Sequence, residues 1–167
     1  MSRELDTAVV LQPDEFALLR RAADRSEIVE TIGAYGFFLD TNDWEAFAEL
    51  FADDAAYDIS PDPDLIPLPL HGREAIVAAM RERREKTGSA VFPRHLATNV
   101  VFRHLDAERA ATSSFLVVVF THLDGRTELR RTGTYVDELC KDGGRWRFSR
   151  RHLQMDTAAP PPEGQAT

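Results

Sequence analysis

The second half of the chain consists of four long runs of β-branched and apolar residues, at about 92–104, 110–122, 127–139 and 145–156. Short turns of polar residues and glycine separate them, at Asp106-Ala107-Glu108, Asp124-Gly125 and Asp142-Gly143-Gly144. Runs of this kind joined by tight turns predict consecutive antiparallel strands connected by hairpins. The chain must therefore accommodate an antiparallel sheet that comes late in the sequence.

Helical patterns fill the first half. We expect one helix from Pro13 to about Ala23, because proline followed by two acidic residues favours a first helical turn. A second helix is expected from Asp24, which has capping-box spacing to Glu27. It carries an apolar stripe at helical spacing, made of Ile28, Ile32, Tyr35 and Leu39.

Two glycines, Gly33 and Gly36, lie inside this second helix. Glycine in a helix interior costs about 1 kcal/mol, so we expect the helix to approach another backbone closely there. A short helix is expected to open at Asn42 and Glu45, again with capping-box spacing. A further strong helix is predicted at 73–87.

A strand is predicted at 55–59, and the segment 60–71 that follows must be a loop, because it contains four prolines. This loop is mildly apolar, so it either closes over a pocket as a lid or packs on the core. Helices first and a strand meander afterwards predict an α+β fold. The strand at 115–120 is apolar on both faces, so we expect it to be central, with helices on one face and a second subunit on the other.

The length of 167 residues indicates one domain, which we place at 13–156. Residues 1–12 form an N-terminal extension in this prediction, and 157–167 form a disordered tail that contains three consecutive prolines. The single cysteine, Cys140, excludes an internal disulfide and a metal site built on paired cysteines. We expect Cys140 to be a half-buried strand residue.

The formal net charge of −8 indicates a surface that repels phosphate groups. Nucleic acid and membrane surfaces are therefore not expected partners. No apolar run approaches the ~20 residues needed to span a bilayer, and the N-terminus lacks the apolar segment of a secretory signal. We expect a cytoplasmic location.

Several catalytic motifs are absent from the sequence, namely a glycine-rich phosphate loop, a nucleophile elbow and a His-Glu-x-x-His helix. Histidine, carboxylate and tyrosine side chains remain as candidates. His104 and His122 border turns, and we expect both to be solvated. His71 precedes a helix. Its side chain either caps that helix or borders a pocket.

Side-chain alternation along the strands separates the other polar candidates. His95 shares a face with Asn99, although neither face of that strand is cleanly polar. In the last strand, Phe148, Arg150 and His152 alternate on one face. Arg150 and His152 are therefore expected to be buried polar groups that need partners, and a structural network is favoured over catalysis for them.

Asp40 ends the second predicted helix, one residue beyond the apolar stripe. The helix dipole disfavours a carboxylate at this end of a helix. The residues alone leave two interpretations open, an exposed loop aspartate or a carboxylate that is kept there for function.

Three segments resemble the signatures of the SnoaL-like domains, a family of the nuclear-transport-factor-two-like (NTF2-like) superfamily. They are YGFFLDTNDWEAFAELFADDA at 35–55, RHLATNV at 94–100 and GRWRFSRR at 144–151. The resemblance implies a cone-shaped α+β barrel, in which a curved, mixed but mostly antiparallel sheet is wrapped by N-terminal helices around a deep apolar pocket. Relatives include polyketide cyclases, scytalone dehydratase, bile-acid dehydratases and ketosteroid isomerases, but also non-catalytic subunits of ring-hydroxylating dioxygenases. The fold therefore leaves the function open.

The resemblance also implies a catalytic pair. Asp40 falls where scytalone-dehydratase-like enzymes hold the aspartate that orients a catalytic histidine, and His95 falls on that histidine. A buried carboxylate on one ring nitrogen fixes the tautomer of an imidazole and raises its basicity. His95 would then remove a proton α to a carbonyl, or pass it to a leaving hydroxyl. Neither a metal nor a cofactor is expected.

The sequence also departs from the dehydratase pattern. Leu39 stands where these enzymes often have a tyrosine, and the strand at 115–120 offers no second pocket histidine. Tyr57 and Tyr135 are candidates to supply a phenol, or else they form pocket wall or core. Asn99 either binds substrate or hydrogen-bonds neighbouring backbone.

We expect substrate contacts from Tyr35, Tyr57, Asn99, Phe115, Val117, Tyr135, Phe148 and Arg150. The favoured function is a cofactor-independent dehydratase, cyclase or isomerase for a small hydrophobic natural-product intermediate such as a polyketide. The alternative is a non-catalytic ligand-binding or assembly subunit. An epoxide hydrolase also stays open, drawing on Arg131, Asp137 and Arg150. A homodimer or higher homo-oligomer is expected.

Overall fold

The computed structural model describes residues 12–61 and 68–156. In chain order the elements are α1 (Pro13–Thr41), α2 (Trp44–Ala48), β1 (Phe51–Ser60), β2 (Leu70–His71), α3 (Arg73–Thr87), β3 (Val91–Leu105), β4 (Arg109–His122), β5 (Thr127–Asp142) and β6 (Arg145–Met155). The meander and the helix at 73–87 lie where the sequence predicts them. Residues 1–11 of the predicted N-terminal extension, the predicted C-terminal tail, and positions 62–67 of the predicted loop lie outside the described residues.

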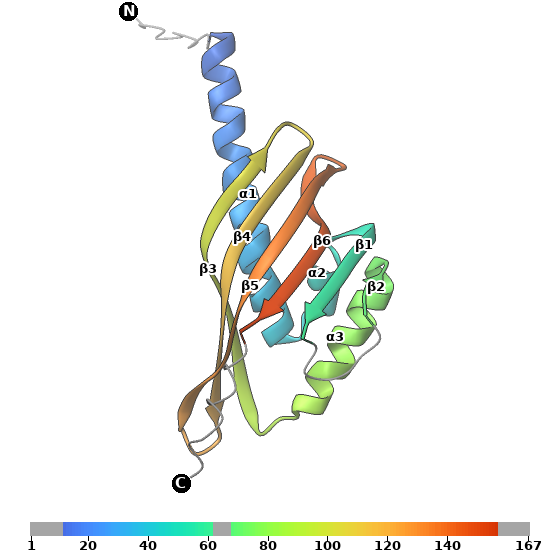
Figure 1. Ribbon diagram of the computed structural model, residues 1–167, viewed down its shortest axis with the longest axis vertical. Coiled ribbons are helices and arrows are strands. Elements are labelled where there is room, and N and C mark those ends of the chain that lie inside the picture. Colours follow the sequence, from blue (N-terminus) through green and yellow to red (C-terminus); the bar gives the residue numbers. More distant parts are fainter. Residues whose placement is uncertain (1–11, 62–67, 157–167) are drawn as a thin grey trace, which may run out of the picture.

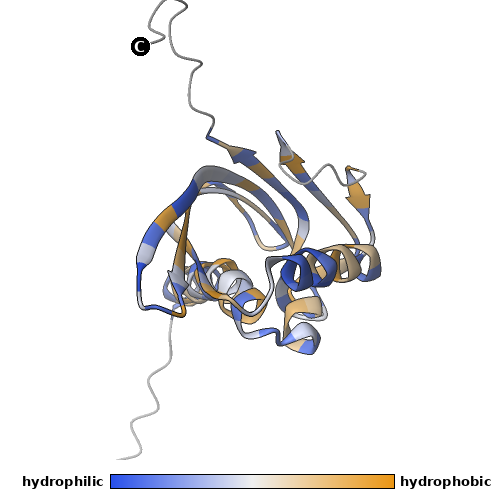
Figure 2. Ribbon diagram, turned by 90° about the horizontal axis from the view of Figure 1, so that it is seen from below, coloured by the Kyte–Doolittle hydropathy of each residue, from blue (hydrophilic) through white to orange (hydrophobic). Residues whose placement is uncertain are grey.

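The six strands form one curved sheet in the order β2-β1-β6-β5-β4-β3. Neighbouring strands are antiparallel except for β1 and β6, which run parallel. The helices lie on one side of this sheet, inside its curve (Figures 1 and 2). The predicted α+β fold with a mixed, mostly antiparallel sheet is therefore confirmed.

A single helix, α1, replaces the two helices expected between Pro13 and Asp40. Asp24 does not begin a helix but lies buried within α1. Its carboxylate accepts hydrogen bonds from Lys141 Nζ at 2.5 Å and from Trp146 Nε1 at 2.9 Å. The prediction of a helix start at Asp24 is wrong because this carboxylate does not cap a helix. It binds the β5–β6 hairpin instead.

The N-cap of α2 lies one residue later than the predicted cap, Asn42. Asn42 adopts the left-handed conformation, with φ 60°, and ends α1. The cap is Asp43, whose Oδ1 accepts a hydrogen bond from the backbone N–H of Ala46 at 3.1 Å.

Irregularities in strand pairing decide which side chains face the helices. In β3 the pairing with β4 shifts between Thr98 and Val101, and Asn99 has a φ of 55°. In β6 the pairing with β5 passes from Phe148 to Arg150, so Ser149 is an extra residue. Such a bulge interrupts the two-residue alternation of a strand. The two faces are therefore exchanged relative to the sequence prediction beyond Ser149 in β6, and in β3 between the bulge at Asn99 and a second shift at Phe102–His104.

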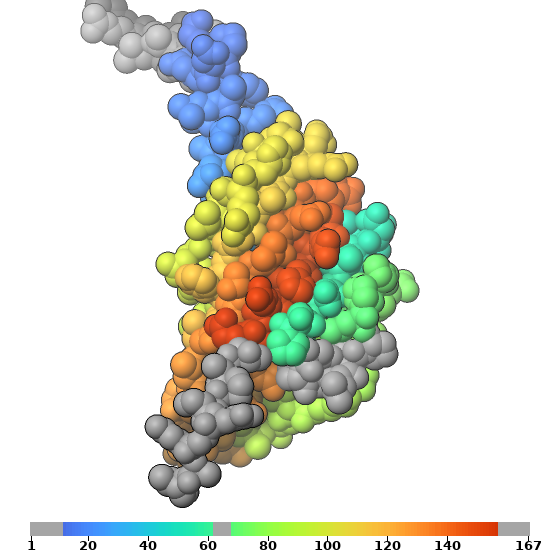
Figure 3. Space-filling view, in the orientation of Figure 1, coloured from blue at the N-terminus to red at the C-terminus, as the bar shows by residue number. Residues whose placement is uncertain are grey.

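The apolar strand β4 is covered on only one face within the described chain. Leu116 and Val118 are buried towards the helices, whereas Phe115 on the other face is 56% exposed. β4 is also next to the edge strand β3 and is not central. Among residues 12–61 and 68–156, no helix crosses the outer face of the sheet, which is the face seen in Figure 3.

The core lies between the sheet and α1. Aromatic rings from α1, α2, β1, β5 and β6 pack there, namely Tyr35, Phe47, Phe51, Tyr135 and Phe148. Cys140 is half-buried in β5, where the sequence predicts it. Within the described ranges, no helix is long and apolar enough to cross a membrane.

Candidate active site

A pocket of about 640 Å³ opens inside the curve of the sheet. Its walls come from α1, the C-terminal half of α3 and five strands, which are β1, β3, β4, β5 and β6. The apolar part of the lining includes Leu39, Ile59, Leu116, Val118, Phe120 and Leu153. A volume of this size is typical of small-molecule sites.

Asp40 and His95 meet at the wall of this pocket. Asp40 Oδ1 lies 2.6 Å from His95 Nδ1, and Asp40 Oδ2 accepts a hydrogen bond of 2.7 Å from the backbone N–H of His95. The Asp40 side chain is only 5% exposed, whereas the ring of His95 lines the pocket. One carboxylate therefore fixes both the main chain and the ring of His95.

Gly36 makes this contact possible. A Cβ atom at Gly36 would lie 2.2 Å from the backbone oxygen of His95. The helix can therefore approach β3 this closely only without a side chain at this position. Gly33 has nothing within 4 Å of such a Cβ atom, so the expected close approach holds for Gly36 alone.

The geometry also determines which ring nitrogen of His95 can accept a proton. An ionised carboxylate can only accept hydrogen bonds, so the 2.6 Å contact requires the proton of a neutral ring to sit on Nδ1. Nε2 then keeps its lone pair. In this arrangement Nε2 is the atom that can take a proton from a molecule in the pocket.

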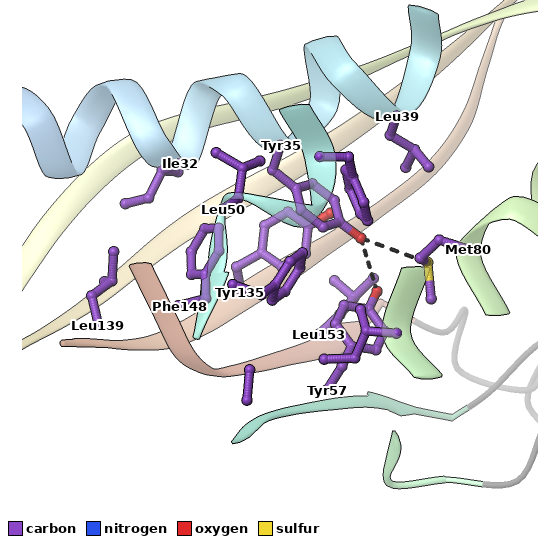
Figure 4. Close-up of a cluster of buried hydrophobic side chains, with 14 of the residues drawn as sticks. Ile32, Tyr35, Leu39, Leu50, Tyr57, Met80, Tyr135, Leu139, Phe148 and Leu153 are labelled. Atoms are coloured by element: carbon purple, nitrogen blue, oxygen red, sulfur yellow. Dashed lines mark hydrogen bonds between the residues drawn. The ribbon is translucent and has the colours of Figure 1, made fainter. Parts of the chain in front are cut away.

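Three buried tyrosines, Tyr35, Tyr57 and Tyr135, form another part of the pocket lining (Figure 4). Tyr35 Oη lies 3.3 Å from Tyr57 Oη and 3.9 Å from the sulfur of Met80. Burial raises the pKa of all three phenols above the ordinary value of 10.0. They therefore stay protonated and can act as hydrogen-bond donors, not as bases.

A buried ion pair lies behind the tyrosines. Arg151 Nε is 3.4 Å from Asp137 Oδ1, and both side chains are fully buried. The guanidinium carbon of Arg151 stands 3.7 Å from the ring centre of Tyr135 and 4.0 Å from that of Tyr35. Burial raises the pKa of Asp137, and the Arg151 guanidinium opposes that rise. This pair supports the tyrosine wall from behind and does not line the pocket.

The lining of the pocket is rich in positive charge. It contains five cationic side chains, which are Arg83, Arg84 and Lys86 from α3 and Arg130 and Arg131 from β5. The only acidic side chain among the described lining residues is Glu128. Its Oε1 lies 3.3 Å from His122 Nε2, and its Oε2 accepts a hydrogen bond of 2.8 Å from Arg126.

A family model for the SnoaL-like domain matches residues 20–152. The chain belongs to the SnoaL-like domain family. This SnoaL-like domain also resembles an NTF2-like protein with a cystatin-like fold from Novosphingobium aromaticivorans, with 22% identity over 91% of this chain and 94% of that chain, and a TM-score of 0.78. A search of curated protein sequences gave no match.

Two other solved structures show the same fold. ActVI-ORFA from Streptomyces coelicolor is 20% identical over 83% of this chain and 99% of its own, with a TM-score of 0.71. A protein from Novosphingobium aromaticivorans, assigned as the beta subunit of an aromatic-ring-hydroxylating dioxygenase, is 25% identical over 87% of this chain and 94% of its own, with a TM-score of 0.65. The SnoaL-like fold is thus shared by proteins with different assignments.

Five of the side chains expected to contact substrate lie outside the pocket of this SnoaL-like domain. Phe115 and Val117 point to the outer face of the sheet, because the inner face of β4 belongs to Leu116 and Val118. Phe148 is wholly buried in the core. The last two, Asn99 and Arg150, are exposed because of the bulges in β3 and β6.

The histidines outside the dyad differ in position. His71 lies exposed in β2, and the His104 side chain is 58% exposed, as its place beside a turn predicts. His122 was expected in solvent but lines the pocket beside Glu128. His152 lies near Asp58, with 3.2 Å between Nδ1 and Oδ2, and not on the aromatic face.

Sequence reasoning missed the buried Arg151 and the cationic side chains of the pocket lining. The bulge at Ser149 places Arg151, and not Arg150, on the aromatic face. The epoxide-hydrolase set is not assembled either, since Arg131 lines the pocket while Asp137 is buried behind it and Arg150 is exposed. In the described ranges, no group of three or more histidine, cysteine, aspartate or glutamate side chains could hold a metal ion.

Proposed function

We propose that this SnoaL-like domain is a cofactor-independent acid–base enzyme, acting as a dehydratase, cyclase or isomerase on a small hydrophobic natural-product intermediate such as a polyketide. The carboxylate–imidazole contact of 2.6 Å at the wall of an apolar pocket carries the proposal. A protein that only binds a ligand has no need of a buried carboxylate that orients a histidine.

In the proposed reaction, His95 Nε2 removes a proton from the carbon α to a substrate carbonyl. Asp40 stabilises the imidazolium that forms, because its carboxylate accepts the Nδ1 proton. The phenols of Tyr57 or Tyr135 are candidates to donate a hydrogen bond to the carbonyl oxygen as it gains negative charge. Tyr35 and Leu39 shape the wall beside them.

The fate of the abstracted proton separates the three reaction types. Return of the proton to another carbon gives isomerisation. Transfer to a β-hydroxyl group, which leaves as water, gives dehydration. Attack of the carbanion on a second carbonyl, followed by protonation of the new alkoxide, gives cyclisation. One base in an apolar cavity serves all three.

Deuterium exchange would test the proton abstraction directly. The protein is incubated in D2O with a panel of apolar ketones and β-hydroxy ketones, and mass spectrometry follows deuterium uptake at the α carbon and loss of water. We expect exchange by the wild type and a loss of roughly 10²–10⁴-fold in His95→Gln. Asp40→Asn should also slow exchange, because the ring loses its orienting carboxylate.

A second histidine–aspartate pair provides the matched control. His104 Nε2 lies 2.8 Å from Asp106 Oδ2 on the exposed turn between β3 and β4, away from the pocket. His104→Gln should leave the exchange rate unchanged. Equal exchange in wild type and His95→Gln would contradict the proposal.

A non-catalytic subunit remains the second candidate. The similarity to a protein assigned as a dioxygenase beta subunit, at 25% identity and a TM-score of 0.65, supports it. If this alternative holds, ligands bind in the pocket without α-proton exchange, and His95→Gln changes neither binding nor partner recruitment.

A further inference from the structure

The charge of the pocket lining is opposite to that of the whole chain. The chain has a formal net charge of −8, yet five cationic side chains and a single carboxylate line the described part of the pocket. Cationic groups in a cleft with apolar walls concentrate the field and attract anions. The distribution therefore points to a ligand with negative charge.

Two of these cations, Arg130 and Arg131, are placed by an irregularity in β5. The pairing of β4 with β5 passes from Val118 opposite Arg131 to Val119 opposite Leu129, so Arg130 is an extra residue. Without the bulge, consecutive side chains would point to opposite faces. With it, both arginines line the pocket.

The same pairing places Arg131 on the same face of the sheet as His95, two strands away. His95 lies opposite Val118, and Val118 lies opposite Arg131, so all three side chains share the inner face. Neighbouring strands lie about 4.8 Å apart, which puts the His95 and Arg131 backbones roughly 10 Å from each other. A ligand of one or two rings would span that distance.

The arginines at the bulge are available to a ligand. Arg126 is bound to Glu128 and Lys86 to Glu82, both at 2.8 Å. By contrast, neither Arg130 nor Arg131 has an ion-pair or hydrogen-bond partner among the described residues. Glu128 cannot readily serve them, because His122 and Arg126 already occupy its two oxygens.

We propose that the substrate of this pocket carries an oxyanion group, a carboxylate or a phosphate, which Arg130 and Arg131 bind. Its apolar body then lies along Leu116 and Val118 and presents the reacting carbon to His95. Guanidinium groups suit this role because they bind carboxylate and phosphate oxygens through paired hydrogen bonds. The inference rests on the proposed function, since it names the substrate class of the same site.

Competition between ligands of one shape and different charge tests the inference. The neutral fluorophore N-phenyl-1-naphthylamine is bound to the pocket and displaced by 1-naphthamide, 1-naphthoate or 1-naphthyl phosphate at low salt. We expect at least one of the two anions to bind roughly tenfold or more tightly than the neutral amide, a difference of about 1.4 kcal/mol. A preference for phosphate identifies a phosphorylated substrate, and a preference for carboxylate identifies a free acid.

The variant Arg130→Gln/Arg131→Gln should abolish that preference and leave the affinity for 1-naphthamide unchanged. Arg109→Gln/Arg145→Gln is the matched control, because it removes the same charge at the opposite end of the sheet, where β4 and β6 begin (Figure 1). The control should keep the preference.

The outcomes separate this inference from the proposed function. If the amide and both anions bind equally, or if the control variant loses the preference as well, the oxyanion inference is overturned while the acid–base site can stand. If anions are preferred but His95→Gln exchanges α protons as fast as wild type, the proposed chemistry fails and the anion site remains.

Discussion

Gly36 shows how one residue of α1 governs the candidate site. Its lack of a side chain lets the helix touch the backbone of β3 at His95, and Asp40 lies one turn further along the same helix. The two hydrogen-bonding contacts between Asp40 and His95 depend on this approach.

Gly36→Ala should therefore disturb the dyad. The added Cβ would lie 2.2 Å from the backbone oxygen of His95, so helix and strand must separate. We expect a loss of about 1–3 kcal/mol in the free energy of unfolding, as for other overpacked sites. Gly33→Ala is the control, because its Cβ meets nothing within 4 Å and should stabilise the helix by about 1 kcal/mol. Urea unfolding measures both, and equal stability of the two variants would contradict the argument.

The tautomer of His95 is a second prediction at this scale. In the wild type at neutral pH, the ¹⁵N chemical shifts of the ring should show the proton on Nδ1, because Asp40 accepts it. In Asp40→Ala the ring should lose that preference, while the signals of His104 stay unchanged. The same Nδ1 tautomer in both proteins would show that Asp40 does not orient the ring.

At the scale of elements, bulges and inter-element anchors position the site. The bulges in β3, β5 and β6 decide that Asn99 faces solvent, that Arg130 and Arg131 line the pocket and that Arg151 is buried. The β5–β6 hairpin is fixed to α1 by Asp24, whose carboxylate binds Lys141 and Trp146.

Asp24→Asn should weaken this anchor in a pH-dependent way. Burial raises the pKa of Asp24, but the hydrogen bonds from Lys141 and Trp146 outweigh burial, so the pKa lies below its ordinary value of 3.8. A lowered pKa in the folded state contributes stability above pH 3.8, and this stability is lost as the pH falls through the folded-state pKa. At pH 7 we expect a loss of about 1.5–3 kcal/mol, as for hydrogen bonds to charged groups.

Urea unfolding between pH 7 and pH 3 measures this effect. The difference between wild type and Asp24→Asn should narrow as the solution is acidified. Glu30→Gln, an exposed substitution on the same helix, should cause little change at any pH. A difference that stays constant with pH would show that the Asp24 charge contributes nothing.

At the scale of the whole molecule, the outer face of the sheet has no cover within the described chain (Figure 3). Six large apolar side chains on its strands are exposed, namely Phe92, Leu96, Val101, Phe115, Leu129 and Val136. Exposed apolar surface gathered on one face marks an interaction site. We propose that a second copy of the chain covers it, as expected for a homodimer.

Sedimentation of wild type and Phe115→Glu tests the dimer. We expect a dimer for the wild type and a monomer for the variant, because a carboxylate buried without a partner in the apolar interface is strongly unfavourable. Leu123→Glu is the control, since Leu123 is 72% exposed in the turn between β4 and β5 and should leave the dimer intact. A monomeric wild type would rule the dimer out.

The sequence by itself determined that helices come first and an antiparallel meander follows, and it located the turns of the meander and the helix at 73–87. It did not predict that one helix spans 13–41, nor that residues 70–71, which it placed in a loop, form β2. The features that it did determine depend on local patterns, namely the spacing of apolar residues and the chemistry of turns. The family signatures also marked Asp40 and His95, which the structure brings into contact. The sequence did not predict that Asp24 lies inside one continuous helix, because its partners Lys141 and Trp146 are more than a hundred residues away.

Only the tertiary structure decided which side chains line the pocket. One extra residue in a strand exchanges its two faces, and whether a residue is extra depends on the pairing with a neighbouring strand. Side-chain alternation along β6 alone therefore predicts that Arg150 lies on the buried aromatic face. The pairing of β6 with β5 places Arg151 there instead. The set of arginines in the pocket lining arises in the same way, because α3 and the bulge in β5 face the same pocket only when the sheet curves around the helices.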